Sequence, residues 1–182
     1  MRRLMLLIVL AVLGAVAQAQ PPPANLGGPF ELTDHNGKAF SSATLAGTPY
    51  AIFFGFTNCP DICPTTLLLM SNALAKLGAD GDRLKVLFVT VDPERDRPDH
   101  LRSYLSSFDA RIIGLTGSEE QIAATAKLWK AFYHQLPENK GGYTVVHSAY
   151  VYLMDGENRL SGTLGFQDEE AVQVEKLKKL LK

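Results

Sequence analysis

The sequence has very little cysteine and no long block of charge of one sign. Its 182 residues include two cysteines, and the formal net charge is −1 at pH 7. This balance gives no electrostatic footprint for a nucleic acid or an anionic lipid surface, so we expect no nucleic-acid partner. With 46% hydrophobic and 20% charged residues, the composition is that of an ordinary globular protein with one core.

The N-terminal segment is apolar but too short for a typical membrane-spanning helix. Arg2 and Arg3 precede an apolar run over residues 4–16, and small residues follow. This is the pattern of a secretory signal peptide, whereas a spanning helix needs roughly 20 apolar residues. We predict that residues 1–19 are a signal peptide, with an uncleaved membrane anchor as the alternative. The protein is therefore expected in the bacterial periplasm or on the outer face of the inner membrane.

The two cysteines, Cys59 and Cys63, are separated by three residues. The stabilisation that a disulfide gives grows with the loop it closes, so a purely structural disulfide would contribute little here. Outside the cytoplasm thiols are oxidised unless they are kept reduced or bound to metal. The pair therefore indicates thiol redox chemistry or metal binding, with an inert disulfide as the remaining alternative.

The order of predicted strands and helices indicates an α/β fold. Residues 20–29 are rich in proline and glycine and form a tether, and the folded domain covers 30–182. An N-terminal β-hairpin is predicted around the Asp34–Gly37 turn. Further elements follow by hydrophobic pattern: strands at 50–56, 84–91, 112–115, 147–153 and 159–164; helices from about 64, from about 98, at 118–132 and after Asp168 as N-cap; and a polar loop at 135–142. Together they predict a mixed central sheet flanked by helices.

The cysteines are predicted to lie between a buried strand and the start of a helix. Backbone N–H groups are unpaired there and the helix dipole is positive, which favours the thiolate form of both side chains. Thiolate is the form that attacks disulfides and the form that binds metal. A pair of cysteines alone is weak evidence for a metal site, so a third ligand has to be found.

His147 is the candidate third ligand. It opens the predicted strand at 147–153, whose entry faces the cysteine loop in such a sheet. Two thiolates and one imidazole suit Cu(I), and Cu(II) with an added oxygen or water, whereas zinc usually takes a fourth ligand. His35, His100 and His134 are expected at the surface. Asp92 directly follows the strand at 84–91, on the same edge of the sheet as the cysteine loop. It is expected either to cap the turn there or to be a carboxylate beside the site.

Three segments resemble the Sco/SenC family: FGFTNCPDICPTT at 54–66, VTVDPERD at 89–96 and HSA at 147–149. The resemblance extends from about Phe30 to the C-terminus. It implies a thioredoxin-like fold, one copper ion bound by Cys59, Cys63 and His147, and Asp92 as an auxiliary residue. Many relatives have Asp immediately before the ligand histidine, whereas Val146 stands there in this chain.

The resemblance also implies a role in assembling the dinuclear copper centre of cytochrome c oxidase. The partners would be the oxidase copper-centre subunit or another copper client, and an upstream copper donor. A non-enzymatic copper chaperone is the first hypothesis. The second is a thiol-disulfide oxidoreductase that keeps the client's cysteines reduced with the same two thiols. A general thioredoxin is disfavoured, because it has two residues between its cysteines and a cis-proline near the position of His147.

Overall fold

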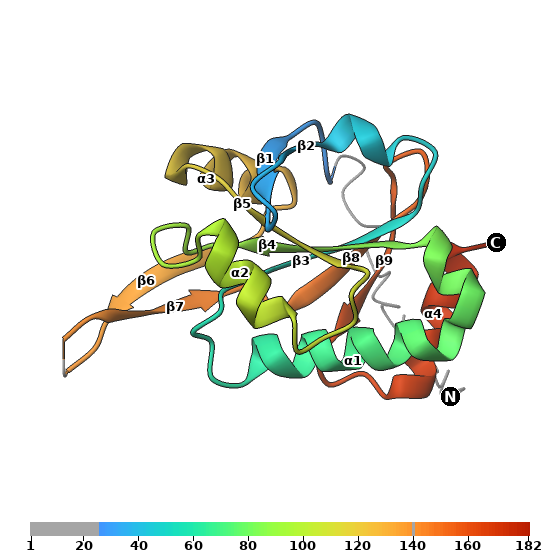
Figure 1. The fold of residues 1–182 in the computed structure, drawn as a ribbon. Coiled ribbons are helices and arrows are strands. Elements are labelled where there is room, and N and C mark those ends of the chain that lie inside the picture. Colours follow the sequence, from blue (N-terminus) through green and yellow to red (C-terminus); the bar gives the residue numbers. More distant parts are fainter. Residues whose placement is uncertain (1–25, 140) are drawn as a thin grey trace, which may run out of the picture.

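The computed structural model describes residues 26–139 and 141–182, and these form an α/β domain (Figure 1). The predicted signal peptide and most of the tether lie outside the described residues. The strands are β1 (Glu31–Asp34), β2 (Ala39–Ser41), β3 (Tyr50–Gly55), β4 (Lys85–Thr90), β5 (Ile112–Thr116), β6 (Tyr133–Pro137), β7 (Tyr143–His147), β8 (Tyr150–Met154) and β9 (Leu160–Gly165). The helices are α1 (Ile62–Leu77), α2 (Pro98–Leu105), α3 (Glu119–Leu128) and α4 (Glu170–Leu180), with short 3-10 helices at Ser42–Leu45 and Gly78–Arg83.

The central sheet is mixed and has seven strands in the order β2-β1-β5-β4-β3-β8-β9. Strands β3, β4 and β5 pair in parallel, whereas β1, β8 and β9 pair with their neighbours in antiparallel fashion. The predicted N-terminal hairpin is confirmed as β1 and β2, and it forms one edge of this sheet. The predicted α/β class with a mixed central sheet is confirmed.

Helices cover both faces of the sheet, and β3 is buried along its whole length. Figure 1 shows α1 and α4 side by side below the sheet and α3 above it. On one face Phe53 packs against Phe88, with ring centroids 5.7 Å apart; on the other Phe54 packs against Trp129 at 5.8 Å. A strand buried on both faces has no polar side, which explains the continuous apolar run in the sequence.

Helix α1 begins two residues earlier than Pro64, at Ile62. Pro64 therefore stands at the third helical position, where its missing N–H removes no intrahelical hydrogen bond. The helical segment Ile62–Arg83 is long and apolar enough to cross a membrane by composition. In this fold Leu67, Met70 and Leu74 of that segment lie in the core, which accounts for its apolar character.

The predicted loop at 135–142 is wrong at its start, because residues 135–137 belong to β6, which pairs with β7 in an antiparallel hairpin; of the rest, the described residues 138, 139, 141 and 142 lie in no strand. The helix expected to reach 132 ends at Leu128, and Lys130 adopts a left-handed conformation with φ 50°. His147 does not open the following strand: it is the last residue of β7, and β8 begins at Tyr150. Figure 1 shows the hairpin extending away from the central sheet. Since most of β6 is exposed, its sequence lacks the alternation of a half-buried strand.

The assignment of Asp168 as the N-cap of the last helix is also wrong. The N-cap of α4 is Glu169, and no side chain caps this helix. The Asp168 carboxylate instead accepts a hydrogen bond from the N–H of Gly165 and pairs with Lys176 at 2.8 Å. It therefore stabilises the turn before the helix rather than the first helical N–H groups.

Candidate metal centre

Three elements bring Cys59, Cys63 and His147 together. Cys59 lies in the loop between β3 and α1, Cys63 lies in the first turn of α1, and His147 ends β7. Their potential ligand atoms all lie within 4.8 Å of one another, and Cys63 Sγ is 3.3 Å from His147 Nε2. Among the described residues, no other group of three His, Cys, Asp or Glu side chains is placed so closely.

The two sulfurs differ in exposure. Cys63 is fully buried, whereas Cys59 is 9% exposed and lines a pocket of about 280 Å³. Val145, Val146, Ile62 and His147 also line this pocket. The N–H of Cys63 donates to Cys59 Sγ at 3.4 Å, as expected for a sulfur at the N-terminus of a helix. Cys59 is thus the sulfur that an incoming molecule can reach.

The thiols also differ in acidity. A hydrogen bond from the Cys63 thiol, with further bonds from His147 and from the N–H groups of Cys63 and Asp61, outweighs burial and lowers the pKa of Cys59 to about 4. Burial and the neighbouring Cys59 thiolate raise the pKa of Cys63. The expectation that both cysteines favour the thiolate is therefore wrong for Cys63 in the metal-free protein, because burial disfavours its charged form.

The imidazole of His147 is oriented by the backbone. Its Nδ1 lies 2.9 Å from the carbonyl oxygen of Ser148, which can only accept a hydrogen bond, so Nδ1 carries a proton and Nε2 faces the sulfurs. Burial lowers the pKa of His147, but hydrogen bonds to Cys59 and Ser148 outweigh it and raise this pKa above its ordinary value. The Ser148 carbonyl thus orients the imidazole ring.

Aromatic rings and a glycine enclose the site. His147 makes edge contacts with the rings of Phe53 and Phe56, at centroid distances of 6.1 and 5.7 Å. A Cβ added to Gly55 would lie 2.7 Å from Cys63 Sγ and 2.8 Å from Phe88. Gly55 therefore leaves the space that the Cys63 sulfur occupies. Its place two residues after Phe53 in a buried strand was the sequence signal for this role, since a strand glycine indicates close approach.

The donor set fits a soft metal ion. Protein sulfur and imidazole ligands lie about 2.0–2.3 Å from a bound ion, so ligands to one ion are separated by at most roughly 4.6 Å. The three atoms of this site are already within 4.8 Å. Two sulfurs and one nitrogen, with apolar side chains behind them and a pocket in front, favour Cu(I) over oxygen-preferring ions.

Asp92 is buried but belongs to a different group of residues. Its carboxylate pairs with Arg95 and accepts a hydrogen bond from the hydroxyl of Tyr143 at 2.7 Å. It lines a separate pocket of about 460 Å³ with Glu94 and Glu119. The structure therefore brings three of the four sequence-predicted residues together and leaves Asp92 outside that cluster.

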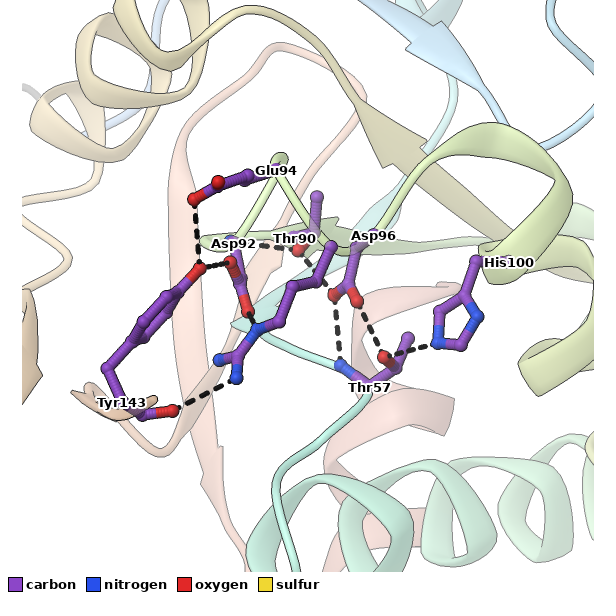
Figure 2. A network of polar contacts seen from close by, with 8 residues as sticks. Thr57, Thr90, Asp92, Glu94, Asp96, His100 and Tyr143 are labelled. Atoms are coloured by element: carbon purple, nitrogen blue, oxygen red, sulfur yellow. Dashed lines mark hydrogen bonds and ion pairs between the residues drawn. The ribbon is translucent and has the colours of Figure 1, made fainter. Parts of the chain in front are cut away.

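A second buried carboxylate supports the cysteine loop, and the sequence analysis did not identify it. Asp96 accepts hydrogen bonds from the N–H of Thr57 at 2.9 Å and from its hydroxyl at 2.5 Å. It also accepts one from the hydroxyl of Thr90 at 2.6 Å. Figure 2 shows Thr57 between Asp96 and His100, whose Nε2 lies 2.9 Å from the Thr57 hydroxyl oxygen. Its place at the end of the VTVDPERD segment at 89–96 was the sequence signal for it.

The other histidines lie apart from the sulfurs. His134 is an exposed residue of β6, and His35 accepts a hydrogen bond from the N–H of Gly114 at 2.9 Å. His100 is an exposed residue of α2, as expected, although it also contacts Thr57.

Comparisons with known proteins show the family of the chain. The family model described as SCO1/SenC matches residues 18–182. The chain is 41% identical over 157 residues to the mitochondrial protein SCO2 of Saccharomyces cerevisiae, covering 84% of this chain and 52% of that protein. It thus spans about half the length of that relative, and 66% of several bacterial ones.

The solved structures that resemble this chain include proteins of the same family. The copper-bound structure of Bradyrhizobium japonicum ScoI is 41% identical, has a TM-score of 0.80, and covers 85% of this chain and 99% of that chain. A second solved structure is that of BsSco, which is described as having a disulfide switch and as a member of the Sco family of cytochrome c oxidase assembly proteins. It is 25% identical, with a TM-score of 0.70 and coverage of 90% and 98%. The fold is therefore thioredoxin-like.

Proposed function

Because the chain belongs to the SCO1/SenC family, we propose that it binds one copper ion per chain through Cys59, Cys63 and His147. The observation that carries this proposal is the convergence of two sulfurs and one imidazole nitrogen within 4.8 Å. The sulfurs come from one loop and helix, whereas the histidine comes from a hairpin 84 residues later. Copper here is cargo: the ion enters and leaves on the side of the pocket that Cys59 lines.

The physiological role in this proposal is a copper chaperone that assists assembly of the dinuclear copper centre of cytochrome c oxidase. It would receive copper from an upstream donor and transfer it to the oxidase copper-centre subunit or another client. Support comes from relatives described as copper-bound and as oxidase assembly proteins. The protein would act in the bacterial periplasm or on the outer face of the inner membrane, with membrane contact only through an uncleaved N-terminus.

Copper binding is tested by a competition titration of the reduced protein with a chelator of known affinity. We expect about one equivalent of copper per chain, and His147→Ala should weaken Cu(II) binding by about tenfold to a hundredfold or more, because it removes the only nitrogen ligand. His134→Ala is the matched control, since His134 lies on the same hairpin and is exposed. Wild-type affinity in His147→Ala would contradict the three-ligand site.

A second candidate function is favoured by the acidity of Cys59. Its pKa of about 4 makes it a thiolate at neutral pH, whereas Cys63 is protonated. The Cys59 thiolate would attack a client disulfide and release one client sulfur as thiolate. Cys63 would then lose its proton and attack the mixed disulfide, which oxidises Cys59 and Cys63 to a disulfide and leaves the client fully reduced.

The two functions are separated by measuring copper affinity and disulfide reduction on the same variants. Reduction depends on both sulfurs but not on a nitrogen ligand, so His147→Ala should retain dithiol chemistry while it loses Cu(II) affinity. Fast reduction of a client peptide disulfide, combined with weak copper binding by the wild type, would favour the oxidoreductase. Tight copper binding with slow reduction would favour the chaperone.

A further inference from the structure

The two halves of the candidate site are held by the same short turn after β4. Residues 91–97 follow this strand and carry two buried carboxylates, Asp92 and Asp96. The N–H of Asp96 donates to the carbonyl of Asp92 at 2.9 Å, so the turn is internally braced. Asp96 contacts the cysteine loop through Thr57, and Asp92 contacts the β6–β7 hairpin through Tyr143. Figure 2 shows these two groups on opposite sides of the turn.

Arg95 is the central residue of the hairpin contact. Its guanidinium pairs with the Asp92 carboxylate and donates to the carbonyl oxygen of Tyr143 at 2.9 Å. The guanidinium carbon also lies 3.9 Å from the centroid of the Tyr143 ring. Tyr143 opens β7, the strand that His147 ends. Arg95 thus contacts the strand that carries the nitrogen ligand through charge, hydrogen bonding and ring stacking.

The same guanidinium reaches His147 through one ring. Its carbon lies 5.9 Å from the centroid of Phe56, whose ring makes an edge contact with the imidazole of His147 at 5.7 Å. Phe56 is 1% exposed, so it has little room to move. Arg95 therefore lies beside two residues that connect it to His147: Tyr143, at the start of β7, and Phe56, whose ring contacts the imidazole.

The β6–β7 hairpin needs such support. An isolated two-stranded ribbon is at best marginally stable in water, and four of the five residues of β6 are exposed. In the described part of the chain, its strands make polar contacts with the domain body at Tyr143 and at His147 itself. Hydrogen bonds between Phe132 and Ser148 join its base.

We propose that Arg95 is a positioning residue that holds the β6–β7 hairpin so that Nε2 of His147 faces the two sulfurs. This inference rests on the proposed copper site and names the residue that sets its nitrogen ligand. An arginine is suited to the task because its planar fork donates to a carboxylate and a carbonyl in two directions while its face stacks on a ring. Lysine would keep the positive charge beside the buried Asp92, but its ammonium group has neither the planar array of N–H donors nor a flat surface that stacks on a ring.

The test compares Arg95→Lys with wild type in two backgrounds, one of them His147→Ala. We expect Arg95→Lys to weaken Cu(II) binding by about tenfold when His147 is present. In the His147→Ala background the further loss should be less than about twofold, because a residue that acts through His147 has no effect once His147 is gone. An equal loss in both backgrounds would overturn the proposal.

A readout without copper keeps this result separate from the proposed function. In the reduced apo protein, hydrogen exchange of the backbone amides of 133–136 and 143–147 should become faster in Arg95→Lys and remain unchanged in the control Arg159→Lys, whose ion pairs lie in the β8–β9 turn. Unchanged exchange in Arg95→Lys would overturn the positioning role. If His147→Ala binds copper like wild type, the three-ligand site fails instead, and the exchange result alone decides the role of Arg95.

Tyr143→Phe is the milder second variant if Arg95→Lys does not fold. It removes the hydroxyl that donates to Asp92 but keeps the ring and the carbonyl that contact Arg95. We expect the same two effects with smaller size: faster exchange in the hairpin, and weaker Cu(II) binding that depends on His147. Copper affinity lowered equally with and without His147 would overturn the proposal here too.

Discussion

The two halves of the candidate copper site, the cysteines and the histidine, are carried by very different parts of the structure. The cysteines lie where a fully buried strand meets a core helix, and Cys63 itself is inaccessible. The histidine lies at the base of a hairpin whose first strand, β6, is largely exposed. One half therefore lies within the core, whereas the other depends on the contacts that join the hairpin to the domain.

The largest effect expected from this asymmetry is in the pH dependence of thiol reactivity. Because the pKa of Cys59 is lowered to about 4, its thiolate persists as the pH falls from 8 to 5. The rate of alkylation by iodoacetamide should change little over this range, whereas an ordinary thiol with a pKa of about 8.5 loses several hundredfold. Mass mapping should find the adduct on Cys59 and not on Cys63.

The control for this experiment is Cys63→Ala. The hydrogen bond from Cys63 is the largest contribution that lowers the pKa of Cys59, so its removal should move the alkylation profile toward higher pH. A wild-type rate that falls tenfold per pH unit below pH 8 would contradict the assignment of Cys59 as the thiolate.

Gly55→Ala tests how tightly the core holds the cysteine half. The new methyl group would meet Cys63 Sγ at 2.7 Å and Phe88 at 2.8 Å, and both of these side chains are fully buried. We expect a loss of about 1–3 kcal/mol in the free energy of unfolding of the reduced protein, measured in urea. Gly162→Ala is the matched control in β9, since no atom of the described residues lies within 4 Å of its added Cβ. Equal stability of both variants would show that the core accommodates the displaced sulfur.

Asp96→Asn tests the polar support of the same half and should have a smaller or similar effect. The carboxylate accepts three hydrogen bonds from Thr57 and Thr90, and the amide nitrogen of asparagine cannot accept one. The arrangement of these hydrogen bonds is disrupted and the charge that strengthens them is removed, so the free energy of unfolding should fall by about 1–3 kcal/mol. The hydrogen exchange of the hairpin amides should stay at the wild-type rate, in contrast to Arg95→Lys.

Faster hydrogen exchange of the hairpin amides in Asp96→Asn as well would contradict the separate roles of Asp96 at the cysteine loop and Arg95 at the hairpin. It would mean that the turn at 91–97 acts as one unit, and that the cysteine loop and the histidine hairpin are not held separately.

Several errors of sequence interpretation fall on the histidine side of the site. The strands buried on both faces were recognisable from continuous apolar runs, and β3 and β4 were placed correctly to within a residue or two. The β6–β7 hairpin was not recognisable, because β6 has no buried residue and carries no hydrophobic alternation, and β7 has one buried residue, Val145. His147 was therefore assigned to the start of the wrong strand, although it was still identified as a ligand candidate.

The sequence by itself determined the chemistry of this protein: an α/β domain, two cysteines at a strand-to-helix junction, a distant histidine and the SCO1/SenC family. These features depend on local patterns and on residue identity, which can be read along the chain. The tertiary structure decided which thiol is acidic, which nitrogen faces the sulfurs, and that Asp92 and Asp96 support opposite halves of the site. Burial and hydrogen-bond geometry between residues far apart in the chain set these properties, so they exist only once the chain has folded.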